Sequence, residues 1–538
     1  MVGRKVIIIK IIVLLFLLLN PAVTQVKFLD NFEDIKSWMS FVSDGASVDI
    51  TQTQGYRGKG LALHFEFHGS GYAIAQKQFK LHLLENYKFT FYLRGDAPVN
   101  NFEFKLLDTS DNVFWIKKLN IEFSKDWTKQ TIKKRHITFA WGPAGGGEIK
   151  YVDKIEFVVS AGTGGGKGTI YIDEFKIEPT TEATPNLKPV ATGSSSAKNS
   201  SPQFSIDENN STNWVSGGKS EHQWLVIDFQ QERELGGLVV DWEKEKYAKA
   251  YNVDFSDDGK NWTTVYRVTN GNGDRDYIYL PEAETRFLRL NLKKSSDNKN
   301  YGISNIDVRS VEFGSSPNAF MSAVASDAPR GYFPKYFSKQ MSYWTIVGVS
   351  GDTKEAMINE EGMIEVDKAS FSLEPFLYLN GKFITWNDVS NSQSLNRDYL
   401  PIPIVEWKYN DFNLKTTTFA ANVEGKPVLV VNYTAENKSD MMVEGKLFVT
   451  LRPFQVNPPS QDLNIVGGTA NIRSIKYSDG IATVNDTTQV LSLSTHNAFG
   501  ATEFDQGDIT SFVSRGEVPS THISSIISVM HLLHSNMT

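Results

Sequence analysis

The stretch FSIDENNSTNWVSGGKSEHQWLVIDF, from Phe204 to Phe229, decides which fold the chain can adopt. Its first half gathers acids, amides and hydroxyls, which are typical of a turn, and its second half, QWLVIDF, has the pattern of a strand. The same residues could form a catalytic cluster, a metal loop, a sugar pocket or only the folding signature of a β domain. The segments on either side are needed to choose between these hypotheses.

Composition limits the class of protein and of partner. The chain has 538 residues, so it needs several separate hydrophobic cores. Its formal net charge is −7, and its lysines and arginines are scattered singly. Because nucleic-acid binding requires a concentrated positive field, we expect no nucleic-acid partner. Cysteine is absent, so neither disulfides nor a lipid-modified cysteine is available.

The first residues predict export from the cell. In MVGRKVIIIKIIVLLFLLLNPAVTQ, basic residues are followed by an uninterrupted apolar stretch, Ile11 to Leu19, that is short for a bilayer span. We interpret residues 1–24 as a signal peptide, the alternative being that the segment stays as an anchor. No later apolar run approaches the ~20 residues of a membrane helix. The expected protein is secreted, extracellular or periplasmic, with no stable membrane span after signal removal.

Composition shifts divide the rest of the chain into blocks. Runs of four to eight alternating residues, punctuated by Gly, Asn and Asp, predict an all-β fold with hardly any helix. The last segment instead has apolar residues at helical spacing and could be a truncated tail. The expected organisation is a first domain at 26–178, a linker at 179–188, a second domain at 189–313, a third at 315–520 and a tail at 521–538.

Side-chain parity in the first block separates core residues from outward-facing ones. Successive strand residues point to opposite faces, so the polar partners of apolar runs such as LALHFEFH and YKFTFYLR face away from the core. If these strands are neighbours, the outer face combines an aromatic platform with charged groups, which suits sugars. The alternatives are an ordinary solvated face or a metal held by His64, Glu66 and His68. The candidate sugar contacts are His64, Glu66, Tyr92, Arg94 and Trp115, and Glu103, Lys105 and Lys117 share their outward parity.

The first block opens with LDNFED, from Leu29, and closes with IYIDEFKI, from Ile170. In these segments it resembles carbohydrate-binding jelly rolls with a galactose-binding-like fold, particularly those of the family-11 type. The resemblance implies a structural calcium ion held by Asp30, Glu33 and Asp173. Carboxylates are suitable ligands because calcium prefers several oxygen donors.

The second block carries YNVDFSDDGKNWTTVY, TRFLRLNL and DVRSVEF after the opening stretch. In their order and spacing these segments resemble the discoidin, or F5/8 type C, domain, whose bacterial forms are grouped with family-32 carbohydrate-binding modules. The resemblance implies a jelly-roll sandwich. It also implies that the acids and amides of the opening stretch form a structural calcium loop. The alternative is a plain Asx turn without an ion. The implied calcium ligands are Asp207, Asn210, Thr212 and Glu312. Candidate sugar contacts in the loops are His222, Arg275 and Tyr301, and Trp214, Trp224 and Trp262 are expected to be structural rings.

The third block contains DAPRGYFPKYF, LRPFQVNPP and GDITSFVSRGEVP. These segments resemble the β-supersandwich that precedes an (α/α)6 barrel in discoidin-bearing, glycosidase-like bacterial proteins. In that architecture the catalytic carboxylates belong to the barrel. The expected fold is therefore all-β, with two galactose-binding-like jelly-roll sandwiches followed by a β-supersandwich.

We expect a secreted protein that binds a polysaccharide or other glycan, as the non-catalytic N-terminal part of a glycoside-hydrolase-like protein. One alternative is an active glycosidase with an unrecognised site in the third block, where Glu360 and Glu361 are adjacent acids. Another is an adhesion protein whose discoidin domain binds protein or lipid. Serine-hydrolase, phosphate-loop and zinc-protease motifs are absent from the sequence. Acidic residues are abundant, however, so whether the chain is an enzyme stays open at this point.

Overall fold

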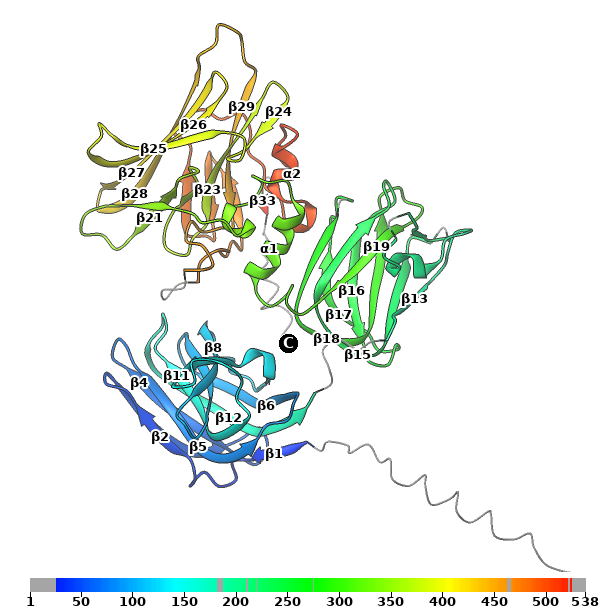
Figure 1. The fold of residues 1–538 in the computed structure, drawn as a ribbon, viewed down its shortest axis with the longest axis vertical. Coiled ribbons are helices and arrows are strands. Elements are labelled where there is room, and N and C mark those ends of the chain that lie inside the picture. The colour runs from blue at the N-terminus through cyan, green and yellow to red at the C-terminus, as the bar shows by residue number, and fades with distance from the viewer. Residues whose placement is uncertain are drawn as a thin grey trace, which may run out of the picture. The chain divides into compact units, whose positions relative to one another are not determined.

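The computed structural model describes residues 26–180, 187–209, 211–218, 220–273, 275–461 and 466–520, and the backbone of 523–524. It divides the chain into two compact units, Met1–Glu182 and Ala183–Thr538, the first and second units (Figure 1). The predicted signal peptide, 1–24, and nearly all of the predicted tail, 521–538, lie outside the described residues. Among the helices in the described ranges, none is long and apolar enough to cross a membrane.

The first unit consists of two antiparallel sheets, named here after β6 and β7. In the β6 sheet the strand order is β3-β4-β12-β6-β9, and β1 pairs with β12; in the β7 sheet it is β10-β8-β7-β11-β5-β2. The β6 sheet comprises β1 (Lys27–Asp30), β3 (Ala46–Gln54), β4 (Lys59–Phe67), β6 (Tyr87–Asp96), β9 (Thr128–Lys133) and β12 (Gly166–Pro179). The β7 sheet comprises β2 (Met39–Val42), β5 (Tyr72–His82), β7 (Asn100–Leu107), β8 (Val113–Ile121), β10 (Thr138–Trp141) and β11 (Tyr151–Ser160), and η1 (Lys134–His136) precedes β10.

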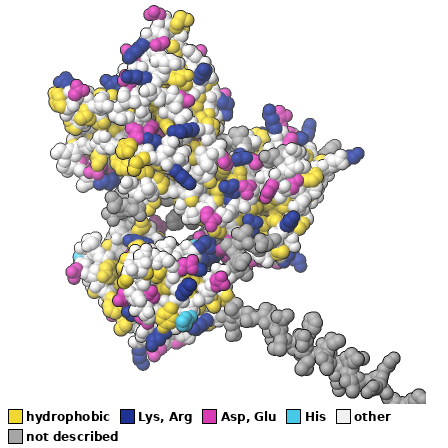
Figure 2. All heavy atoms as spheres, in the orientation of Figure 1, with side chains coloured by type: hydrophobic (Ala, Val, Ile, Leu, Met, Phe, Trp, Pro, Cys, Tyr) yellow, Lys and Arg dark blue, Asp and Glu magenta, His cyan; other side chains and the backbone are white. Residues whose placement is uncertain are grey.

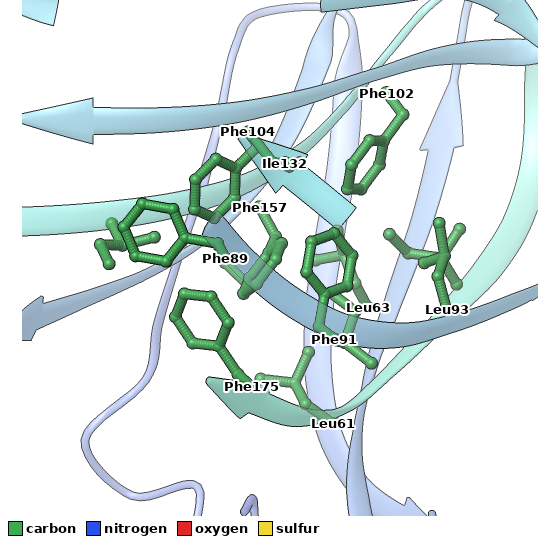
Figure 3. Packing of buried hydrophobic residues seen from close by; sticks show 14 of the residues in the cluster. Leu61, Leu63, Phe89, Phe91, Leu93, Phe102, Phe104, Ile132, Phe157 and Phe175 are labelled. Atoms are coloured by element: carbon green, nitrogen blue, oxygen red, sulfur yellow. The ribbon is translucent and has the colours of Figure 1, made fainter. Parts of the chain in front are cut away.

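Phenylalanine rings from both sheets fill the core of the first unit (Figure 3). Phe89 of β6 lies 5.2 Å from Phe104 of β7, and Phe91 lies 5.0 Å from Phe157 of β11, measured between ring centroids. Each such ring contributes about 1.5–3 kcal/mol when it is removed from water. Because these rings alternate along their strands with polar side chains, the polar side chains point outward and create two outer faces.

The first part of the second unit is a further β-sandwich. Its strand order is β14-β19-β15-β18-β16-β17, and β13 pairs with β15. β15 and β18 have 20 residues each, and register shifts along their pairing bend both strands. The elements are β13 (Val190–Gly193), η2 (Pro202–Ile206), β14 (Trp214–Val215), β15 (Gln223–Trp242), β16 (Ala248–Ser256), β17 (Thr263–Val268), β18 (Asp276–Ser295) and β19 (Gly302–Arg309).

The second part of the second unit packs one sheet, β20-β21-β22-β23-β24 with β29, against another, β25-β26-β27-β28. Ile358 and Leu377 of the first of these sheets share a core with Trp407 and Leu414 of the second. The chain after β29 forms a small sheet with the strand order β32-β31-β30-β33. This sandwich and the two before it confirm the predicted all-β fold of two jelly rolls followed by a β-supersandwich.

The remaining elements are α1 (Pro317–Asp327), η3 (Lys335–Ser338), β20 (Trp344–Gly348), β21 (Glu355–Asn359), β22 (Ile364–Glu365), β23 (Ser372–Leu379), β24 (Lys382–Ile384), β25 (Ser390–Asn396), β26 (Leu400–Tyr409), β27 (Phe412–Val423), β28 (Lys426–Asn437), β29 (Gly445–Arg452), β30 (Ile475–Ser478), β31 (Ile481–Val484), β32 (Thr488–Leu491), η4 (Phe504–Gln506), α2 (Ile509–Val513) and β33 (Ile523–Ser524). Helix α1 connects the two parts of the second unit. Its Phe320 packs edge-on against Tyr279 of β18 at 5.2 Å. The two parts therefore share buried apolar surface.

Candidate functional site

The five candidate sugar contacts of the first unit lie on two different outer faces. β4 and β6 both flank β12, so His64, Glu66, Tyr92 and Arg94 share the outer face of the β6 sheet. β8 belongs to the other sheet, so Trp115 lies on the outer face of the β7 sheet. The expectation of one continuous platform was therefore wrong. Parity gives the direction of each side chain but does not say which strands are neighbours.

The outer face of the β7 sheet, the β7 face, carries charged and aromatic side chains in register. Gln76 of β5, Glu156 of β11, Lys105 of β7 and Trp115 of β8 are successive cross-strand partners in one row. Side chains in such a row stand about 5 Å apart on the same face. The β7 face is defined by Tyr72, Gln76, Glu103, Lys105, Trp115, Lys117, Trp141 and Glu156.

Three rings surround the ammonium group of Lys105. The distances from Nζ to the ring centroids of Trp141, Trp115 and Tyr72 are 5.2, 5.7 and 5.9 Å. Trp115 and Trp141 meet edge to face at 5.3 Å. Trp141 is 49% exposed and Tyr72 is 42% exposed, whereas Lys105 is 7% exposed. The lysine therefore lies beneath the rings and fixes them by cation–π attraction, while the rings face solvent.

The two carboxylates of the β7 face are buried and hydrogen-bonded, and Glu103 is also ion-paired. Glu103 accepts a hydrogen bond from Ser160 Oγ at 2.8 Å and pairs with Lys105 at 2.9 Å and Lys117 at 3.5 Å. Glu156 accepts a hydrogen bond from Gln76 Nε2 at 2.6 Å. A carboxylate has about four lone-pair positions, so each can accept further hydrogen bonds from a ligand. Two lysines oppose two carboxylates, which leaves the face without net charge.

The outer face of the β6 sheet, the β6 face, is built differently. It is defined by Tyr56, His64, Glu66, Tyr92, Arg94, Trp127 and Tyr171. The rings of Tyr56 and Tyr92 stack at 3.7 Å with an interplanar angle of 10°, and a hydrogen bond between the two side chains raises the pKa of Tyr92. The guanidinium of Arg94 lies 3.9 Å from the Tyr171 centroid and 5.2 Å from that of Trp127.

Both ring nitrogens of His64 are already engaged. Nε2 bonds to the hydroxyl of Thr51 at 2.8 Å, and Nδ1 bonds to the hydroxyl of Thr169 at 2.9 Å. Glu66 is the cross-strand partner of Ser47 and Lys167. Among the described residues, there is no group of three or more His, Cys, Asp or Glu side chains that could hold a metal ion. His64 is therefore suited to ordering the sheet rather than to binding a metal.

The predicted calcium ligands of the first unit have protein partners. Asp30 accepts hydrogen bonds from Phe32 N–H at 2.7 Å, Trp38 Nε1 at 2.8 Å and Lys77 Nζ at 2.6 Å, so an ammonium group already neutralises it. Asp30 therefore does not fit the role of a calcium ligand.

Glu33 and Asp173 shape the turn between β3 and β4. Glu33 accepts the N–H of Lys59 at 2.9 Å, and Asp173 accepts that of Arg57 at 2.8 Å. Burial raises the pKa of Asp173. The two carboxylates thus fix the turn that presents Tyr56.

The predicted calcium loop of the second unit gathers suitable oxygen donors. Asp207 accepts the hydroxyl of Thr212 at 2.9 Å and the N–H of Asn209 at 3.0 Å, and the carbonyl of Asn209 also accepts from Thr212. Asn210 lies outside the described residues, and Glu312 lies in the turn after β19. The donor chemistry at Asp207 and Thr212 fits calcium, and the ion stays a prediction.

The loop candidates of the second unit differ in their surroundings. Tyr301 is fully buried and donates its hydroxyl to the carbonyl of Glu221 at 2.5 Å. Arg275 Nε donates to Asp241 at 2.6 Å and Nη1 to Asp327 of α1 at 3.2 Å. These contacts give both side chains structural roles. His222 is exposed.

Of the tryptophans expected to be structural, Trp214 is fully buried and Trp262 is half-buried beneath the guanidinium of Arg289, at 4.1 Å. Trp224 is 39% exposed because it alternates along β15 with the core residues Leu225 and Ile227. The expectation for Trp224 was therefore wrong, and parity along QWLVIDF could have corrected it.

Sequence reasoning missed several rings of the two faces. Tyr171 alternates with the core residues Ile170 and Ile172, so its outward direction was readable from parity. Tyr56 lies in a turn and Trp127 precedes a strand, so neither belongs to a periodic run. Trp141 ends the short strand β10 after a register shift. Only the fold brings these rings beside Arg94 and Lys105.

Glu360 and Glu361, the adjacent acids of the third block, both pair with Lys335. Glu361 is buried, which raises the pKa of its carboxyl group. Two carboxylates that share one lysine do not form the open pair across a cleft that glycoside hydrolysis uses.

Comparison with known proteins identifies one domain. Residues 190–306 match the F5/8 type C domain. The range corresponds to the sandwich formed by β13 to β19. It carries the discoidin motifs of the sequence.

The curated relatives match short stretches. The chain is 36% identical over 94 residues to the discoidin, CUB and LCCL domain-containing protein 2 of Rattus norvegicus, covering 14% of this chain and 12% of the relative. It is 28% identical over 100 residues to the polysaccharide lyase 8 family protein HylA of Enterococcus faecalis, covering 17% of this chain and 7% of the relative. The chain thus spans a small fraction of the length of these relatives.

Two of the similar solved structures are binding modules. Chitosan-binding module 2 from a chitosanase/glucanase of Paenibacillus sp. IK-5, solved with chitotriose, is 26% identical, with 23% of this chain and 97% of the module covered and a TM-score of 0.22. The family 11 carbohydrate-binding module of a cellulosomal cellulase of Clostridium thermocellum is 18% identical, with 30% and 97% covered and a TM-score of 0.26.

Proposed function

We propose that the chain binds polysaccharide without cleaving it, through the β7 face of the first unit together with the F5/8 type C domain. The observation that carries the proposal is the group of three rings held around the buried Lys105. The C–H faces of sugars pack against aromatic rings, and sugar hydroxyls pair with carboxylates such as Glu103 and Glu156.

The β7 face is organised before a ligand arrives. Ser160 and Lys105 hold Glu103, and Gln76 holds Glu156, by hydrogen bonds within the first unit. Binding therefore immobilises few additional side chains, which lowers its entropic cost. Because the two lysines and two carboxylates of this face balance, a neutral glycan meets no net charge.

A second module would strengthen binding to a polymer. The F5/8 type C domain lies in the second unit, and the relative in Enterococcus faecalis that matches this chain is named a polysaccharide lyase. Two linked weak sites raise each other's effective concentration on one polysaccharide chain. The pairing of Glu360 and Glu361 with Lys335 supports binding rather than cleavage.

We extend the proposal to the parent protein and to its location. The β-supersandwich motifs support a place before a catalytic barrel in a glycoside-hydrolase-like protein. Sequencing the downstream genomic DNA tests this: an in-frame helical barrel would support it, and a genuine stop would contradict it. The basic and apolar residues within 1–24 support secretion. N-terminal sequencing of the protein collected outside the cell should begin near residue 25, and retention of residues 1–24 would contradict cleavage.

Affinity electrophoresis of the full chain on a panel of neutral polysaccharides tests the main proposal. Retardation by at least one of them is expected, with no release of reducing sugar. Trp141→Ala should weaken that binding about tenfold, as expected for an exposed aromatic contact. Phe28→Ala, which removes a 53% exposed ring from the other sheet, should leave it unchanged. Equal losses in both variants, or cleavage by the purified chain, would overturn the proposal.

A further inference from the structure

We infer that the β6 face is a second and separate binding site, and that its ligand is an acidic sugar residue whose carboxylate pairs with Arg94. This inference goes beyond the neutral-glycan binding proposed for the β7 face and does not depend on it. It rests on the surroundings of Arg94, on the rings beside it and on the turn that presents Tyr56.

Arg94 is a half-buried cation without a protein partner. Its guanidinium lies between Tyr171 and Trp127, and its Nε atom is buried without a hydrogen-bond partner among the described residues. With the residues that the structure describes, Arg94 makes neither an ion pair nor a hydrogen bond. A partly desolvated charge is costly unless a partner compensates it, so the site favours an anion supplied from outside.

Arg289 in the second unit provides an internal comparison. Its guanidinium stacks on Trp262 at 4.1 Å, as Arg94 does on Tyr171. Arg289, however, also donates to Asp254 at 3.0 and 2.8 Å through Nε and Nη2. The β6 face has the same stacked arginine without the carboxylate. A ligand carboxylate placed at Arg94 would complete the arrangement that the protein builds for itself at Arg289.

The rings beside Arg94 indicate a sugar rather than a small inorganic anion. Tyr56 is 41% exposed, stacks on Tyr92 and lies 6.4 Å from Trp127, which also contacts Arg94. The exposed ring of Tyr56, met edge-on by Trp127, therefore lies near the guanidinium. A uronate residue carries both a pyranose ring for this exposed ring and a planar carboxylate for the guanidinium fork.

The turn that presents Tyr56 is rigid. Glu33 and Asp173 accept the N–H groups of Lys59 and Arg57 on either side of it. Gly58 has a φ of +58°, and a Cβ atom there would lie 1.9 Å from Glu33 Oε1. The exposed ring is thus held in place before binding. Arg57, whose side chain is 72% exposed, lies 6.0 Å from the Tyr56 centroid and is already paired with Glu174 at 4.0 Å, so Arg94 is the cation left for the ligand.

Calorimetry of the full chain with an oligo-uronate and with its methyl ester tests the inference. The acid should bind, and the ester should bind at least tenfold more weakly because it cannot form the ion pair. Arg94→Gln should weaken binding of the acid at least tenfold and leave neutral-polysaccharide binding unchanged. Arg94→Lys keeps the charge without the planar fork, and its affinity for the acid should fall several-fold.

Lys88→Gln is the matched control, because Lys88 lies on the same strand and face, roughly 20 Å from Arg94 along β6. It should bind the acid as the unaltered chain does. Equal losses in Lys88→Gln and Arg94→Gln, equal binding of acid and ester, or displacement of the oligo-uronate by an equal concentration of inorganic phosphate would overturn the inference. Should Arg94→Gln fail to fold, the acid–ester comparison on the unaltered chain still decides.

Discussion

The two outer faces of the first unit are made by the same alternation of residues and treat charge in opposite ways. The β7 face buries Glu103 and Lys105 as a pair at 2.9 Å beneath its rings. The β6 face holds Arg94 between rings, and no carboxylate among the described residues pairs with it. A charge that is paired internally positions its neighbours, whereas one that is left unpaired is available to a ligand.

The difference is local and is not a consequence of overall charge. On the side of the molecule seen in Figure 2, basic and acidic side chains are interspersed with apolar ones. The inner sides of both sheets pack against the phenylalanine cluster shown in Figure 3, so the two outer faces share one core. What separates them is the partner of each cation: Lys105 pairs with Glu103, two residues away on the same face of β7, whereas Arg94 contacts only the rings of Tyr171 and Trp127.

The largest expected contrast is in stability. Lys105→Met removes the buried cation 2.9 Å from Glu103 and leaves that carboxylate with the longer, 3.5 Å contact to the more exposed Lys117, so it should lower the free energy of unfolding by about 2 kcal/mol. Arg94→Met removes a cation that has no described protein partner and should change stability by less than about 0.5 kcal/mol. Chemical denaturation of both variants measures the difference. Equal losses would mean that Arg94 is paired in solution, and the comparison would fail.

A change in the turn between β3 and β4 should affect the β6 face alone. Gly58→Ala places a Cβ atom against Glu33 at a left-handed φ, which should cost about 1–2 kcal/mol and displace Tyr56. Binding of an oligo-uronate should fall, while binding of neutral polysaccharide should persist. Calorimetry with the two ligands checks this. A loss of both would show that the two faces are not independent.

Salt should have a smaller effect, and it should weaken binding of the acidic ligand more than binding of the neutral one. Raising sodium chloride from about 0.05 to about 0.5 M shortens the Debye length roughly threefold, so binding of oligo-uronate at Arg94 should weaken several-fold. Neutral-polysaccharide binding at the β7 face should change less than about twofold, because the ligand carries no charge and the lysines and carboxylates of the face balance. The test is a salt titration with each ligand. Equal salt dependence would contradict the assignment of an anion to the β6 face.

Chelation should have the smallest effect on either face. Backbone N–H groups, not an ion, hold Glu33 and Asp173 around the turn, so EDTA should leave both binding activities unchanged. The second unit should lose roughly 2–4 °C in melting temperature if calcium occupies the Asp207 loop. Asp207→Asn should abolish that response. Loss of oligo-uronate binding on chelation would mean that the turn needs a cation after all.

Side-chain parity and sequence motifs predicted much of the fold and part of the candidate site. They gave the all-β class, the F5/8 type C domain and the outward direction of Tyr92, Arg94 and Trp115. They did not reveal that Tyr301 is buried or that Arg275 is anchored to α1, since both residues lie near strand ends where periodicity stops.

The sequence by itself determined which side chains leave the core, because strand residues alternate with a period of two. Only the tertiary structure decided which strands are neighbours, and therefore that Lys117 of β8 meets Glu103 of β7 while Arg94 meets Tyr171 and Trp127. Strand pairing depends on contacts between residues far apart in the chain, which no local pattern records. The same rule of alternation thus produced one satisfied face and one with a cation left for a ligand.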